Sequence, residues 1–196
     1  MRKLAALTGT VALAAALTAC SSSSSSSNAA PTTKSGTETL TATVGGKTAA
    51  HMLASNSNAP LAFPKLALTG PVTTSVSPFT LGGPSTGKAT FKTPAGNFVV
   101  THSSGNKGGG KAVWTRSGNV CTFHQVFTKG TYVVDGAKST GKFAGATGRG
   151  TFTVSAVAAM NLLHGQTKCT AKGTGNPMAS GTAITFQASG PLTVKQ

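Results

Sequence analysis

A glycine-rich segment between two alternating stretches limits the fold of this chain more than any other feature. Thr131–Asp135 and Thr151–Val157 alternate polar and apolar side chains, as β-strands do. The segment 136–150 between them carries five glycines and one large apolar side chain, Phe143. Glycine at this density marks positive φ angles or close backbone approach, because it loses much chain entropy on folding. The pattern predicts a tight, kinked reversal in a closed β-structure, with Phe143 filling the core beneath it.

Two segments have almost the spacing of a phosphate-binding loop. Gly136–Lys142 is followed by Phe143, and Gly82–Lys88 is followed by Ala89, where such loops need Ser or Thr to hold magnesium. Neither segment precedes a helical pattern, so no helix N-terminus is available for a phosphate. We therefore interpret both segments as turns.

Composition favours one antiparallel β-domain over residues 37–196. Thr, Ala, Gly, Val and Phe dominate this part, whereas Glu, which long amphipathic helices favour, is almost absent. Its length of about 160 residues is that of one ordinary domain. About eight strands joined by short turns predict a barrel, since closure removes exposed strand edges. The candidate strands are Glu38–Val44, Lys47–Met52, Leu61–Thr69, Val72–Leu81, Lys88–Thr93, Asn97–His102, Ala112–Arg116, Val120–Thr128 and Thr182–Val194, with Trp114 as a core anchor. Ala156–Leu163 fits a short helix, and Val154–Met160 also fits a buried strand end.

The N-terminal region has the features of a lipoprotein signal. Arg2 and Lys3 precede an uncharged stretch too short for a comfortable membrane span, and residues 1–19 end in small side chains before Cys20. This resembles a bacterial lipobox, which predicts lipidation of Cys20 and anchoring at the extracytoplasmic face of the cell membrane. The alternative is an ordinary signal peptide. Serine-rich residues 20–36 are predicted to be a flexible linker.

The two remaining cysteines, Cys121 and Cys169, are predicted to form a disulfide, which is the default outside the cytoplasm. His124 and His164 lie near them, but neither spacing matches a zinc site. We assign no metal and no cofactor to this chain.

Without Arg2 and Lys3, fifteen basic residues face two acidic ones, a formal charge of +13. The basic residues are scattered and form no motif, so specific nucleic-acid binding is not expected. The charge is consistent with a solubilising surface, or with unspecific attraction to an anionic membrane or cell wall.

The segment Thr140–Phe152 resembles the glycine-rich motif of allene oxide cyclase-like and dirigent-like β-barrels. The residues that carry the likeness are Gly141, Phe143, Gly145, Gly148 and Gly150. The resemblance implies an eight-stranded antiparallel, calycin-like barrel with an apolar cavity, and it makes an oligomer possible. In the plant relatives that cavity directs cyclisation or coupling of hydrophobic intermediates.

The catalytic groups of that family do not carry over, so we assign no catalytic residue. Glu38 lies next to the linker, and Asp135 opens the glycine-rich turn, where Asp commonly forms turns. The four histidines, 51, 102, 124 and 164, are isolated in the sequence. The leading hypothesis is a non-enzymatic barrel that binds a small apolar ligand or a cell-envelope partner. The alternatives are a cyclase or isomerase acting inside the barrel, and association with an anionic surface.

Overall fold

The computed structural model describes residues 32–55, 60–81, 86–105 and 110–196. The signal segment 1–19, Cys20 and the linker up to residue 31 lie outside the described residues, as do residues 82–85 of one predicted turn. No helix among the described residues is long and apolar enough to cross a membrane.

The described part of the chain is almost entirely β-structure. Its elements, in chain order, are β1 (Thr33–Gly45), α1 (Gly46–Ala54), β2 (Leu61–Phe63), β3 (Leu66–Thr69), β4 (Thr74–Val76), β5 (Phe79–Leu81), β6 (Thr86–Thr93), β7 (Gly96–Ser104), β8 (Val113–Ser117), β9 (Val120–Val134), the 3-10 turn η1 (Gly141–Phe143), β10 (Thr147–Leu162), β11 (Thr174–Pro177) and β12 (Ala183–Lys195).

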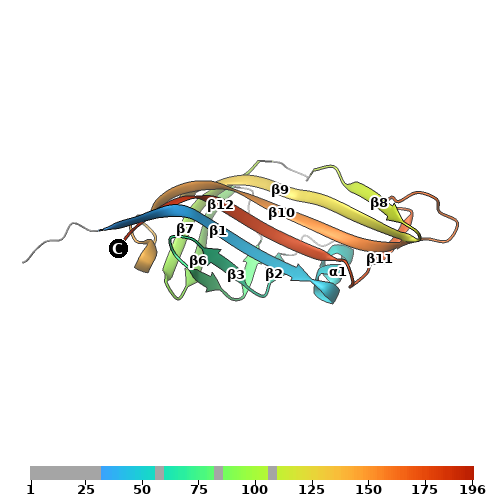
Figure 1. The fold of residues 1–196 in the computed structure, drawn as a ribbon, viewed down its shortest axis with the longest axis horizontal. Helices are drawn as coiled ribbons and strands as arrows, with labels where there is room; N and C mark the ends of the chain where they lie inside the picture. The colour runs from blue at the N-terminus through green and yellow to red at the C-terminus, as the bar shows by residue number, and fades with distance from the viewer. Residues whose placement is uncertain (1–31, 56–59, 82–85, 106–109) are drawn as a thin grey trace, which may run out of the picture. The chain divides into compact units, whose positions relative to one another are not determined.

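Eight strands form a nearly closed antiparallel barrel, as the sequence predicts. Their order is β4-β3-β1-β12-β10-β9-β7-β6, and β4 at one end of this order comes close to β6 at the other. Figure 1 shows the long strands β1, β12, β10 and β9 running side by side. The short strands β8 and β11 pair with β9 and β10, and β2 and β5 form a separate two-stranded sheet.

Alternation along each strand sends one set of side chains inward. In β12, Ile184, Phe186 and Ala188 are buried while their neighbours are more exposed. The hairpin of β6 and β7 has the predicted register, with Phe91 opposite Phe98. Because the side-chain period of a strand is two, this register places Ala89, Phe91, Phe98 and Val100 on the barrel's inner face, while Val99 points to the other face.

The glycine-rich reversal closes one end of the barrel. It runs from Asp135 to Ala146 between β9 and β10 and contains only the short turn η1. Gly141 has φ +60°, and a Cβ there would overlap the carbonyl oxygen of Ala95. Phe143 is fully buried and stacks on Phe98 with ring centroids 4.8 Å apart. The reversal therefore lies against the start of β7 with Phe143 beneath it.

The prediction of a strand over Lys47–Met52 is wrong, because these residues belong to helix α1. The strand β12 begins at Ala183, opposite Gly45, so the ladder between β1 and β12 stops at this pair. The sequence KTAAHMLA is rich in good helix formers, and Ala49 and Ala50 bury one side of the helix.

Other boundaries also differ from the prediction. The strand β1 begins at Thr33, inside the predicted linker, because residues 33–36 pair with the end of β12. Residues 156–162 continue β10 as a strand. Leu61–Thr69 is divided into β2 and β3 around Pro64, where a proline cannot supply a ladder N–H. Trp114 packs on Phe123 at 5.3 Å, outside the main core.

The predicted disulfide between Cys121 and Cys169 is present. It ties β9 to the segment between β10 and β11, and the two residues are 48 positions apart. Cys121 itself is fully buried.

Replacing both cysteines by serine is expected to destabilise the domain. The open chain regains loop entropy in its unfolded state, which lowers the free energy of unfolding by up to about 4 kcal/mol. Urea unfolding under oxidising conditions measures this loss. Wild-type protein in reductant is the control and should match the double variant; equal stability of oxidised wild type and double variant would contradict the prediction.

Candidate functional site

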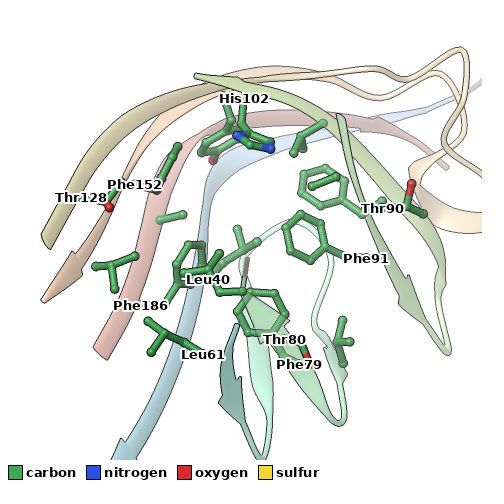
Figure 2. Close-up of a pocket in the computed structure, with 18 of the residues that line it drawn as sticks. Leu40, Leu61, Phe79, Thr80, Thr90, Phe91, His102, Thr128, Phe152 and Phe186 are labelled. Carbon is green, nitrogen blue, oxygen red and sulfur yellow. The ribbon is translucent and has the colours of Figure 1, made fainter. Parts of the chain in front are cut away.

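The barrel contains a cavity of about 800 Å³. Six phenylalanines line it, namely Phe79, Phe91, Phe98, Phe127, Phe152 and Phe186. Figure 2 shows Phe152 and Phe186 on one side of the cavity and Phe91 on the other, with Phe79 below. This volume lies within the range of pockets that hold drug-sized ligands. The aromatic side chains therefore surround an open space and do not fill it.

The mouth of the cavity lies where the barrel is not closed. The exposed lining residues come from β6 and from the short segment that contains β5; they are Pro78, Thr80, Lys88, Thr90 and Lys92. The remaining lining is mostly apolar and comes from the inner faces of the long strands. A ligand can thus enter past these exposed residues and bury its apolar part inside.

Two glycines on facing strands shape the inner wall. Gly130 of β9 pairs with Phe152 of β10, and Gly150 of β10 pairs with Tyr132 of β9. A Cβ on Gly130 would overlap the Phe152 ring, and one on Gly150 would lie 2.6 Å from ring atoms of Tyr132. Each ring therefore lies flat over the glycine of the opposite strand. This arrangement keeps two aromatic side chains against the wall, out of the cavity.

One transverse row of the barrel brings together residues that are far apart in sequence. Glu38 of β1 pairs with Gly190 of β12, and Gly190 lies against Gly150 of β10. Gly150 pairs with Tyr132, which pairs in turn with His102 of β7. The row thus carries a carboxyl group, a phenol and an imidazole, with two glycines between the carboxyl group and the phenol.

Glu38 is buried, with only 1% of its surface exposed. The backbone N–H of Val72 donates a hydrogen bond to Oε2 at 3.1 Å, while Oε1 has no partner. Burial raises the pKa of the Glu38 carboxyl, and the Val72 hydrogen bond and the charge of Lys34 oppose this shift only in part. Glu38 follows the predicted linker in the sequence, and its burial was not predicted.

Tyr132 and His102 line the cavity. Burial raises the pKa of the Tyr132 phenol, and the nearby Glu38 carboxylate raises it further. The His102 ring meets Phe152 edge to face, with centroids 6.3 Å apart, and Figure 2 shows both at the upper side of the cavity. Sequence reasoning treated His102 as isolated, because its pairing with Tyr132 depends on strand register.

Asp135 lies outside this row, in the turn that the sequence predicts. Its carboxylate pairs with Lys88 at 3.1 Å, and this hydrogen bond is the main reason that the pKa of Asp135 is lowered. Asp135 also accepts hydrogen bonds from the backbone N–H groups of Lys138 and Ser139. The histidines at 51, 124 and 164 are exposed. Across the described ranges, no group of His, Cys, Asp and Glu side chains could hold a metal ion.

Comparison with protein-family models, with curated proteins and with solved structures finds no match to this chain. The likeness to allene oxide cyclase-like barrels therefore stays a prediction, while the barrel itself rests on its strand order and register.

Glu38→Gln is expected to change the pH dependence of stability. The folded protein holds the Glu38 proton more strongly than the unfolded chain, whose pKa is about 4.5. The contribution of Glu38 to the free energy of unfolding is therefore complete below that pH, and it is lost as pH rises through the pKa of the folded state. The neutral amide avoids the buried charge, so the variant should exceed wild type at pH 7 by about 1–3 kcal/mol.

Urea unfolding at pH 4, 5.5 and 7 checks this expectation. Asp135 titrates in both proteins, so the difference between them isolates Glu38. A variant that is less stable than wild type at pH 7 would show that the carboxylate is stabilised in the folded protein. A difference that does not change with pH would show that folding leaves the pKa of Glu38 unshifted.

Proposed function

We propose that this protein is a membrane-anchored, extracytoplasmic lipoprotein whose barrel binds a small apolar ligand without transforming it. The observation that carries the proposal is the open cavity of about 800 Å³ with its six phenylalanines. An apolar ligand that leaves water for this cavity gains roughly 25 cal/mol per Å² of buried apolar surface. The lipid on Cys20 and the linker would hold the barrel near a membrane, where such ligands are concentrated.

A second candidate is an isomerase or cyclase that acts on a hydrophobic substrate inside the barrel. It is favoured by Tyr132 and His102, two proton-transferring groups on the cavity wall. Asp135 gives no support to this candidate, because its carboxylate forms a salt bridge with Lys88 in the turn. Binding of the ligand is common to both candidates; only the second requires that a bound molecule be recovered in altered form. A cell-envelope partner and an anionic surface remain further alternatives, favoured by no residue at this site.

Filling the cavity should abolish ligand binding. Ala89 lies on β6, faces inward and lines the cavity, so Ala89→Trp places a large side chain in the space. We expect at least a tenfold loss of affinity for the neutral fluorescent probe N-phenyl-1-naphthylamine, because its apolar rings can no longer be buried. A fluorescence titration measures the affinity.

Val133→Trp is the matched control, since Val133 is 57% exposed on the outer side of β9. This variant should bind the probe as wild type does, and thermal unfolding verifies that both variants fold. Undiminished binding by folded Ala89→Trp protein, or no binding by wild type, would reject the cavity as the binding site.

The anchoring part of the proposal predicts a processed and lipidated N-terminus. Mass analysis of protein from bacterial membranes should find a mature chain that begins at Cys20 and carries acyl chains, which hold it at the membrane. Cys20→Ala should release the protein from the membrane fraction, whereas Ser22→Ala should not. An unmodified Cys20 would refute the anchor and leave the cavity proposal standing.

A further inference from the structure

We propose that the ligand is a neutral, mostly apolar molecule with one oxygen group, and that the hydroxyl of Tyr132 binds this oxygen. Glu38 acts as a positioning residue behind the phenol. This inference rests on the proposed function, because it concerns the ligand of the same cavity. It adds the chemical class of the ligand and the residue that selects it.

The direction of the Tyr132 side chain follows from the glycines beside it. Its ring crosses from β9 to β10, where ring atoms including Cζ lie over Gly150. The hydroxyl is bonded to Cζ, and the next position of the row, Gly190, also lacks a side chain. The phenol therefore extends along an empty stretch of wall toward Glu38.

Glu38 lies close enough to act on this phenol. Three strand spacings of about 4.8 Å separate the backbones of Tyr132 and Glu38, and the two residues between them in the row, Gly150 and Gly190, carry no side chain. Oε2 of Glu38 is held by the backbone N–H of Val72. The charge of Glu38 adds to burial in raising the pKa of the Tyr132 phenol. Oε1 of Glu38 is buried without a partner, and it is an acceptor that the Tyr132 hydroxyl can face.

The Tyr132 hydroxyl has hydrogen-bonding capacity that the protein does not use. No hydrogen bond joins it to another residue of the described chain, although Tyr132 is only 6% exposed. A buried tyrosine hydroxyl usually has a partner. Because Tyr132 lines the cavity, a ligand oxygen can reach its hydroxyl from the open space. The neighbouring His102 offers a second polar group at the same level.

A neutral group fits this position better than a charged one. The described lining of the cavity contains no acidic residue, and its two lysines, Lys88 and Lys92, are exposed at the mouth. A charged group next to Tyr132 would lose its hydration without an opposite charge to replace it. Burial also disfavours negative charge here, as the raised pKa values of Glu38 and Tyr132 indicate.

The experiment compares naphthalene, 2-naphthol and 2-naphthoate as competitors of N-phenyl-1-naphthylamine on the whole domain. Tyr132→Phe removes only the hydroxyl. We expect it to weaken 2-naphthol about fivefold, the equivalent of one neutral hydrogen bond, and to leave naphthalene unchanged. Thr128→Val is the matched control, because Thr128 is another hydroxyl of the cavity lining and should affect neither competitor.

Glu38→Gln tests the positioning role. It should weaken 2-naphthol and spare naphthalene, a difference that a general loss of packing would not produce. The inference is overturned if Tyr132→Phe leaves the ratio of the two affinities unchanged, if Thr128→Val carries the loss, or if wild type prefers 2-naphthoate to 2-naphthol. Failure of naphthalene itself to compete would overturn the cavity proposal, and this inference with it.

Discussion

The structure depends on close contact between aromatic rings and the glycines that face them across the sheet. The ring of Phe152 lies over Gly130, and the ring of Tyr132 lies over Gly150. Without a Cβ beneath them, these rings lie along the wall and do not project into the interior. A small barrel usually fills its interior with side chains. Here the paired glycines explain how a barrel rich in phenylalanine keeps an open cavity.

The same contacts produce the polar part of the site. Two glycines, Gly150 and Gly190, leave no side chain between Tyr132 and Glu38 along the row, and the charge of Glu38 helps to raise the pKa of Tyr132 from a non-adjacent strand. The sequence contains no motif for this arrangement, because its members are Glu38 near one end and Tyr132 far along the chain. The site arises from register, and the register is fixed by the apolar alternation of each strand.

Local signals predicted the fold well and the site poorly. Period-two alternation identified the hairpin of β6 and β7, and glycine density identified the reversal around Phe143. The helix α1 was missed, because its short run of small and polar residues resembles a weak strand. Glu38 shares its face with Leu40, Ala42 and Val44, so the same alternation could have placed it inside. The cavity could not be predicted, since its volume depends on side chains from many strands.

The burial of Glu38 is informative because this chain has only two acidic residues. One of them, Asp135, stabilises a turn and pairs with a lysine. The other lies in the core with one oxygen unpartnered, where a carboxyl group costs stability. A molecule that binds the folded barrel would offset that cost, since any ligand of the folded state stabilises it. Under the proposed function, ligand binding would therefore help the folded barrel to tolerate this buried acid.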